Sequence, residues 1–359
     1  LFMALKVKNG FSSFDTWEKD ERRRDTLSDE KIAALQNECD FWRFLQFEFF
    51  RELTALKDYA KSKNVALIGD IPIYVAYDSA DVWAHPEIFR LDKNMRPKEV
   101  AGVPPDYFSA DGQLWGNPLY DWKKQQADGF LWWHHRLLHQ LQFFDKIRID
   151  HFRAFESYYA VPYGATTAKI GRWVKGVGTK IFDGLDLDGR IIAEDLGIIT
   201  DKVRRLVKRT GFPGMKVFQF AFDGKSDNEH LPENVRYNTV YYTGTHDNDT
   251  LKGWYDAQGD GTKEYVKKTL GATDENVFDK AFKRVMRSRA KFVIVPMQDY
   301  LLQGSEARMN TPGTNDGNWK YVLPKNYAKV KNRIRKYVKN RCSNSAARTA
   351  LLKSHYCKQ

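Results

Sequence analysis

"DKIRIDHFRAF", residues 145–155, begins like a buried strand but carries charged side chains where apolar ones are expected. Successive side chains of a strand point to opposite faces, so Arg148 and Asp150 share one face. Charged side chains are rarely buried unless they are paired, because an unpaired buried charge loses its hydration. The stretch therefore predicts a strand that carries either a structural ion pair or an active site at its end.

Five further stretches have the near-continuous apolar character that is typical of parallel strands covered on both faces. They are residues 65–75, 190–197, 214–222, 238–247 and 290–299. Helical patterns precede or follow several of these stretches, namely 132–144, 199–211 and 275–291. Alternating strands and helices predict an α/β fold.

Polar side chains gather at the C-terminal ends of these predicted strands. They are Asp70, Asp150, Glu194, Asp195, His246, Asp247 and Asp299. Ligands and catalytic groups lie at this end in α/β barrels and in open parallel sheets alike. Carboxylates at so many strand ends indicate one shared site.

The net charge of +12 is concentrated near the C-terminus. Residues 325–359 contain eleven lysines and arginines and no acidic residue. We expect residues 324–359 to form a solvated, basic and partly helical tail. Nucleic-acid binding is the alternative for this tail, but no nucleic-acid partner is expected for the chain.

Composition also limits the class of protein. The three cysteines, Cys39, Cys342 and Cys357, are too few and too scattered for a disulfide framework or a zinc site, which favours the cytoplasm. No run of about 18 apolar residues is present, so no membrane association is expected. The start at Leu1 lacks a signal-peptide pattern and an initiator methionine, and we expect it to lie inside a longer reading frame.

Two patterns resemble metal sites but are incomplete. Residues 184–195 imitate a calcium loop, yet Gly184 stands where the first ligand is needed. His135 and His139 are four residues apart on a predicted helix, without the adjacent glutamate of a zinc motif. We therefore predict no metal site.

Three acidic residues have surroundings that indicate catalysis. Arg148 beside Asp150 favours the ionised carboxylate, which is the form that acts as a nucleophile. Glu194 ends an apolar strand, where desolvation favours the protonated form that a general acid needs. Together with Asp247 at a third strand end, these residues resemble the paired carboxylates of glycoside cleavage.

The stretch 104–122 supplies aromatic side chains among polar ones, which is typical of sugar-binding loops. Its aromatic residues include Tyr107, Phe108, Trp115 and Tyr120. We expect this stretch to be a loop that covers the mouth of the site.

The strand-end motifs resemble a known family. "GDIPIYV", "RIDHF", "AEDLG" and "THD" resemble the four signature regions of the α-amylase clan. The residues of these motifs are similar to those of the 4-α-glucanotransferases called amylomaltases or disproportionating enzymes, which form glycoside hydrolase family 77. Further matching stretches are "VPPDYFSADGQLWGNPLYDW", "GFPGMKVFQFAF" and "RMNTPGT" followed by "NW", so the resemblance extends from Phe2 to Trp319.

The resemblance implies a retaining double displacement. Asp150 is the implied nucleophile, Glu194 the implied general acid and base, and Asp247 the implied stabiliser of the distorted sugar ring. The resemblance also implies substrate contacts by Arg148, His246, Trp115, Asp70, Tyr74, His151, Asp195 and Asn318. The implied substrates are maltooligosaccharides and α-1,4-glucans, with no metal or organic cofactor.

Members of this family have a (β/α)8 TIM barrel, of which this chain contains strands three to eight. The implied organisation is a catalytic barrel region at 1–323, with a helical insertion at 1–62 before the third strand, and the basic tail at 324–359. Two departures are Ala154, where the family usually has glycine, and "NWKYVL", which differs after its tryptophan. An incomplete barrel has open strand edges.

Two alternatives to the transferase remain at this stage. An α-glucan hydrolase would use the same carboxylates but would only shorten glucans. A truncated, non-catalytic glucan-binding protein is favoured by the two strands that are not found.

Overall fold

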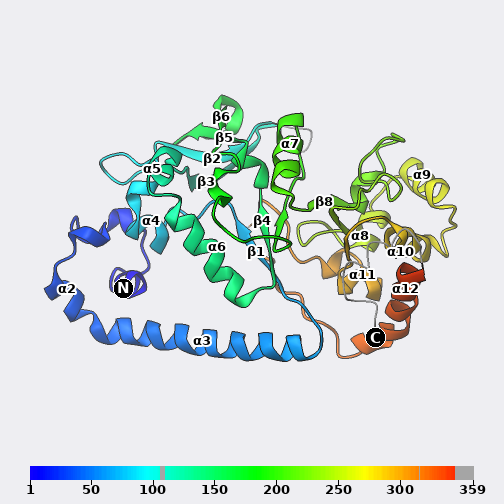
Figure 1. Cartoon of the computed structure of the whole chain (residues 1–359), viewed down its shortest axis with the longest axis horizontal. Coiled ribbons are helices and arrows are strands. Elements are labelled where there is room, and N and C mark those ends of the chain that lie inside the picture. The colour runs from blue at the N-terminus through cyan, green and yellow to red at the C-terminus, as the bar shows by residue number, and fades with distance from the viewer. Residues whose placement is uncertain (106–109, 315, 344–359) are drawn as a thin grey trace. The chain divides into compact units, whose positions relative to one another are not determined.

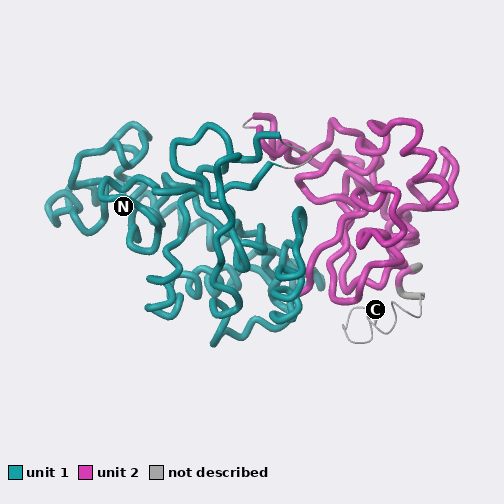
Figure 2. The backbone as a smooth tube through the Cα atoms, turned by 90° about the horizontal axis from the view of Figure 1, so that it is seen from above, with its two compact units in different colours: residues 1–212 teal, residues 213–359 magenta. Residues whose placement is uncertain are grey.

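The computed structural model describes residues 1–105, 110–314 and 316–343, and divides into two compact units, Leu1–Phe212 and Pro213–Gln359 (Figure 2). Tyr107 and Phe108 of the predicted sugar-binding loop lie outside the described residues. The tail residues 344–359, with Cys357, lie outside them too.

The first unit begins with helices and short 3-10 turns. The helices of residues 1–62 are α1 (Phe2–Lys8), α2 (Asp29–Ala34) and α3 (Gln36–Ser62) (Figure 1). Ser28 caps α2 by accepting a hydrogen bond from the Lys31 N–H, which stabilises a helix start. α3 lies against α6 (Leu131–Phe143), where the Phe50 ring stacks on Phe143 at 4.8 Å.

A parallel three-stranded sheet positions the first predicted site residues. Its strands are β1 (Ile68–Pro72), β4 (Lys146–Asp150) and β7 (Ile191–Ala193), hydrogen-bonded in the order β1-β4-β7. Asp70 pairs with Arg148, and Ile149 pairs with Ala193. The isoleucines Ile147 and Ile149 are fully buried on the opposite face from Arg148 and Asp150, as the alternation predicts.

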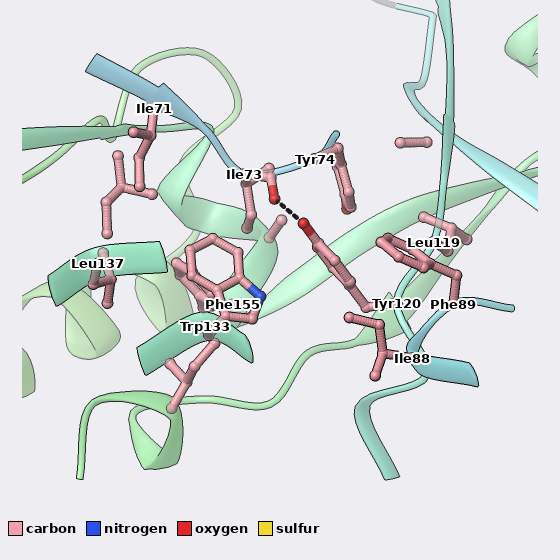
Figure 3. Close-up of a cluster of buried hydrophobic side chains, with 14 of the residues drawn as sticks. Ile71, Ile73, Tyr74, Ile88, Phe89, Leu119, Tyr120, Trp133, Leu137 and Phe155 are labelled. Carbon is pink, nitrogen blue, oxygen red and sulfur yellow. Dashed lines mark hydrogen bonds between the residues drawn. The ribbon is translucent and has the colours of Figure 1, made fainter. Parts of the chain in front are cut away.

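Aromatic and branched apolar side chains form the core beside this sheet. Figure 3 shows Ile71, Ile73, Trp133, Leu137 and Phe155 in this cluster. The buried hydroxyl of Tyr120 donates a hydrogen bond to the backbone oxygen of Ile73 at 2.8 Å. This bond satisfies a polar group that burial would otherwise leave unpaired.

A second sheet of the first unit is antiparallel, and the sequence did not predict it. Its strands are β2 (Glu99–Val103), β3 (Gln113–Pro118), β5 (Ser157–Pro162) and β6 (Arg172–Lys175), in the order β3-β2-β5-β6. The expectation of a loop over 104–122 is therefore wrong for Gln113–Pro118, which is a strand. Gly116, Asn117 and Pro118 are typical turn residues, and they conceal this strand in the sequence.

The remaining helices of the first unit are α4 (Ala80–Ala84), α5 (Trp122–Ala127) and α7 (Asp201–Thr210). The Thr200 side chain accepts the Val203 N–H at the start of α7, and Gly211 ends α7 with φ 71°. A left-handed glycine is the usual helix end, because a side chain is strained there. The helix predicted within 199–211 is confirmed.

The second unit contains another parallel sheet. Its strands are β8 (Gly214–Val217), β9 (Thr239–Tyr242) and β10 (Phe292–Ile294), in the order β10-β9-β8. Its helices are α8 (Leu251–Asp256), α9 (Asp260–Leu270), α10 (Val277–Arg287), α11 (Met297–Leu301) and α12 (Lys331–Ser343). All six predicted strands are present, and the sheets of the described residues do not form a closed barrel.

The described part of the basic tail is docked rather than free. In α12, the Tyr337 hydroxyl donates to Asp279 of α10 at 2.8 Å. The Arg341 guanidinium is buried and donates to the backbone oxygens of Met286 and Ala290. Within the described part of the chain, no helix has the length and apolar character needed to cross a bilayer.

Candidate active site

Arg148 joins two carboxylates at the C-terminal end of the first parallel sheet. Its guanidinium donates to Asp70 and to Asp150, both at 2.6 Å, and only 7% of the residue is exposed. Burial lowers the pKa of Arg148, but the adjacent Asp150 and Asp70 outweigh burial and raise the pKa overall. The predicted ion pair is therefore confirmed, and it lies at the strand end where the other interpretation places an active site.

Glu194 lies next to Asp150 on the neighbouring strand end. Ile149 of β4 is paired with Ala193 of β7. Asp150 and Glu194 are the next residues after this pair, one on each strand. Burial, and then the charge of Asp150, raise the pKa of Glu194 to about 7. The expectation that desolvation raises this pKa is confirmed.

Backbone N–H groups hold the Glu194 carboxyl in place. One oxygen, Oε2, accepts the His151 N–H at 2.8 Å, and Oε1 accepts the Leu196 N–H at 2.7 Å. These bonds and the Arg148 charge favour ionisation, but burial and Asp150 dominate. Glu194 can therefore hold or release a proton close to neutral pH.

His151 has a backbone conformation that side chains rarely adopt. Its φ is 53° and its ψ 43°, in the left-handed region, and this turn aims its N–H at Glu194. Non-glycine residues in this region are uncommon and concentrate at functional sites. Burial, and then the Arg153 charge, lower the pKa of the His151 ring to about 3, so the ring is neutral at pH 7.

Aromatic side chains line this group of charges. The Trp115 ring on β3 meets the His151 ring edge-to-face at 4.7 Å, and the Tyr74 ring lies 6.4 Å from Trp115. The Trp115 indole N–H donates to Gln113 at 3.1 Å, which fixes the ring orientation. Aromatic faces beside carboxylates are what a sugar ring requires, with its apolar faces and polar edges.

Asp195 follows Glu194 directly and is partly buried. The first unit therefore brings together the predicted residues Asp70, Tyr74, Trp115, Arg148, Asp150, His151 and Glu194.

Asp247 belongs to the second unit and lies in the loop between β9 and α8. Asn310 donates from its side-chain amide to Asp247 Oδ1 at 2.7 Å, and Arg308 donates to the Asp247 backbone oxygen at 2.7 Å. His246 Nε2 lies 3.4 Å from Asp247 Oδ2. Arg308 and Asn310 both lie in the stretch "RMNTPGT", for which the resemblance implies no residue roles.

A buried carboxylate braces the loop that carries Asp247. Asp299 accepts the Thr243 hydroxyl at 2.5 Å and the Leu251 N–H at 2.7 Å, on either side of the loop. Burial raises the pKa of Asp299 to about 6. The prediction that Asp299 lies at a strand end is wrong, because β10 ends at Ile294 and Asp299 lies in α11.

A cavity of about 150 Å³ opens beside this loop and is lined by His246, Asp299, Arg308 and Trp319, among others. The Trp319 ring lies 5.1 Å from the His246 ring. The Asn318 side chain accepts a hydrogen bond from the Thr311 N–H and donates one to the backbone oxygen of Thr314. These bonds connect Asn318 to the preceding part of its own loop. Its predicted substrate contact stays a prediction.

Metal-ligand clusters are absent from residues 1–105, 110–314 and 316–343, where no group of three or more His, Cys, Asp or Glu side chains has suitable geometry.

The family model described as 4-alpha-glucanotransferase matches residues 1–326. The chain belongs to the 4-α-glucanotransferase family, glycoside hydrolase family 77. A 4-alpha-glucanotransferase from Clostridium butyricum is 48% identical over 328 residues, which are 89% of this chain and 67% of that protein. A 4-alpha-glucanotransferase from Thermus thermophilus is 47% identical over 335 residues, covering 90% of this chain and 67% of that protein.

A solved structure agrees with these sequence matches. The amylomaltase from Streptococcus agalactiae in complex with acarbose has a TM-score of 0.88 and 34% identity, and the match covers 95% of this chain and 70% of that one. The 4-α-glucanotransferase family and its glycosyltransferase class, both predicted from the motifs, are confirmed. The fold is accordingly of the α/β, TIM-barrel-like type.

Proposed function

We propose that this chain catalyses 4-α-glucanotransfer by a retaining double displacement, with Asp150 as nucleophile and Glu194 as acid and base. The observation that carries the proposal is the buried Glu194 beside Asp150, with a pKa raised to about 7. Neighbouring parallel strands are about 4.8 Å apart, so carboxylates at adjacent strand ends can reach the separation of about 5–5.5 Å that retaining enzymes use.

In the first step, an Asp150 oxygen bonds to the anomeric carbon as the glycosidic carbon–oxygen bond breaks. The Glu194 proton passes to the departing oxygen, and a covalent glycosyl ester remains on Asp150. In the second step, Glu194 takes the proton of an acceptor sugar hydroxyl, whose oxygen displaces Asp150. A pKa near neutrality suits both roles, because Glu194 must first donate a proton to the leaving group and then accept another from the acceptor.

The supporting residues have proposed roles that follow from their contacts. Arg148 keeps Asp150 ionised and oriented through their 2.6 Å contact. The neutral His151, with Tyr74 and Trp115, forms an aromatic wall for sugar rings and excludes water in favour of a sugar acceptor. Asp70 and Asp195 are proposed to accept hydrogen bonds from sugar hydroxyls.

Asp247 is proposed to bind ring hydroxyls and to stabilise the positive charge that develops on the sugar. Its carboxylate is oriented by Asn310, and His246 lies beside it. Asn318 is a further proposed substrate contact. The proposed substrates are maltooligosaccharides and α-1,4-glucans, with no nucleic-acid partner, and the cytoplasm is the proposed compartment.

We further propose that residues 1–323 form one catalytic region, an incomplete barrel in which β1, β4, β7, β8, β9 and β10 are strands three to eight. Residues 1–62 are then a helical insertion, and residues 324–359 a basic tail. The order of strands within each parallel sheet follows the chain, as in a TIM barrel, and supports this proposal.

A chimera tests the proposed function. In this chimera, the whole of this chain is fused to the part of the Clostridium butyricum relative that this chain does not match. From maltotriose, the chimera should produce glucose together with longer and shorter maltooligosaccharides, and Asp150→Asn should abolish these products. Monotonic shortening would indicate the hydrolase, and acarbose binding by calorimetry without turnover would indicate the glucan-binding alternative.

A further inference from the structure

Arg153 is a buried charged residue that has no role in the mechanism proposed above. It lies in the short 3-10 turn Phe152–Phe155, which follows His151, and only 4% of the residue is exposed. Burial lowers the pKa of its guanidinium, because the position disfavours the charged form. Charged side chains are rarely buried to this degree, so the contacts of Arg153 call for an explanation.

The Arg153 guanidinium connects two segments of the first unit to its own turn. Its Nη1 donates to the backbone oxygen of Ile198, in the loop between β7 and α7, at 2.5 Å. Its Nη2 donates to the hydroxyl of Ser157, the first residue of β5, at 3.2 Å. Arg153 therefore ties the turn after β4 to the loop after β7.

These same two segments supply the hydrogen bonds that orient Glu194. The His151 N–H comes from the turn after β4, and the Leu196 N–H comes from the loop after β7. Ile198, whose backbone oxygen Arg153 holds, is two residues beyond Leu196 on that loop. A displacement of the loop would therefore move the Leu196 N–H away from the Glu194 carboxyl.

The Trp173 ring covers the Arg153 guanidinium. The guanidinium carbon lies 3.8 Å from the ring centroid, and Trp173 is 41% exposed on β6, at one end of the strand order β3-β2-β5-β6. A cation–π contact of this kind strengthens as water is excluded. The Arg153 Nε is buried and has no hydrogen-bond partner among the described residues. Trp173 therefore helps to keep water from competing with Ile198 for the guanidinium.

We propose that Arg153 is a positioning residue for Glu194: by holding the loop after β7, it keeps the Glu194 carboxyl oriented for proton transfer to the leaving oxygen. The inference rests on the proposed role of Glu194 as acid and base. Arg153 acts through Glu194 and is assigned no contact with the sugar. Such positioning has large effects, because a misplacement of about 1 Å can lower a rate about 100-fold.

Two donors with different leaving groups test this role in the chimera. Arg153→Met should lower kcat/KM for maltotriose about 100-fold, because the leaving sugar needs a well-placed acid. For maltosyl fluoride, whose leaving group needs little protonation, the loss should stay below about threefold. A merely structural role would lower both values in parallel. Glu194→Gln should favour the fluoride donor in the same way, with a larger loss on maltotriose.

Arg190→Met is the matched control, because Arg190 makes the same kind of bond at the opposite end of β7. Arg190 directly precedes β7, and its guanidinium donates to the backbone oxygen of Leu141 at 2.8 Å. This variant should lower the free energy of unfolding but keep the wild-type ratio of the two kcat/KM values.

Trp173→Ala is a second variant, which decides the question if Arg153→Met does not fold. It removes the cover of the guanidinium from a partly exposed position. The ratio of the two kcat/KM values should shift toward the fluoride donor by about fivefold, as expected for the loss of a cation–π contact.

Amide hydrogen exchange of the full chain, measured by NMR, gives a readout that does not depend on activity. Arg153→Met should speed exchange at the Leu196 N–H at least about tenfold, because the loop opens locally, while residues 146–150 exchange as in wild type. The proposal is overturned if Glu194→Gln favours the fluoride donor but Arg153→Met lowers both values in parallel, or if exchange at Leu196 is unchanged. If Glu194→Gln itself does not favour the fluoride donor, the acid role of Glu194 is refuted, and this inference with it.

Discussion

Glu194 is buried between a positive and a negative charge, and its protonation links catalysis to stability. Its pKa is about 7 in the folded chain and 4.5 when unperturbed. Between these pH values the folded state binds more protons than the unfolded state, so the free energy of unfolding falls as pH rises. The site therefore costs stability at the pH where a glutamate is normally ionised.

Glu194→Gln should remove this cost. The free energy of unfolding of the variant, relative to that of wild type, should increase as the pH is raised from 5 to 8. The increase should reach up to about 3 kcal/mol for a shift of this size. Urea unfolding of both proteins at the two pH values measures the difference, with the exposed Glu30→Gln as control. A difference that does not change with pH would show that Glu194 has an ordinary pKa.

The same proton should control the rate. In the chimera, kcat/KM for maltotriose should fall above pH 7, because Glu194 loses the proton that the leaving sugar requires. The His151 ring does not contribute in this range, since its pKa is about 3. A maltosyl fluoride donor, whose leaving group needs little protonation, should show a weaker fall. Identical profiles for both donors would contradict the acid role.

At the scale of elements, the loop between β9 and α8 is held from both sides by Asp299. Asp299→Ala removes both hydrogen bonds and leaves Thr243 and the Leu251 N–H without their acceptor. Loss of such buried bonds should lower the free energy of unfolding by about 2–4 kcal/mol. Urea unfolding measures this loss, and Asp299→Asn, which keeps one acceptor oxygen, should lose less. A loss below about 0.5 kcal/mol, typical of surface sites, would show that the brace is unimportant.

The parallel strands and their main helices were predictable because their signals are local. Buried strands such as Ile191–Ala193 are continuous apolar runs, and α7 has a threonine cap and a terminal glycine. The antiparallel sheet was not predictable, because β3 contains the turn residues Gly116, Asn117 and Pro118, and because β2 pairs with β5 about 60 residues away. The position of Asp299 was wrong for a different reason, because the predicted strand ran past Pro296, which follows the end of β10 at Ile294 and precedes α11.

At the scale of the whole molecule, the grouping of charged residues at the strand ends was easier to predict from the sequence than the contacts of Asp247. Arg148, Asp150 and Glu194 were identifiable from charges at strand ends, and the structure brings them together. The contacts of Asn310 and Arg308 with Asp247 join segments about 60 residues apart, and periodicity carries no such information. The left-handed turn at His151 was equally hard to predict, because only a few per cent of non-glycine residues adopt this region, although histidine is enriched among them.

The central claim is that Asp150 forms the covalent bond to the sugar. The Glu194→Gln chimera, treated with maltosyl fluoride, should form the glycosyl ester but transfer it slowly, because the base is missing. Trypsin releases residues 149–153, in which Asp150 is the only carboxylate side chain. Mass spectrometry should find one maltosyl group on this peptide, and no label when Asp150→Asn is added. A maltosyl group on any other peptide, or an undiminished label with Asp150→Asn, would contradict the account.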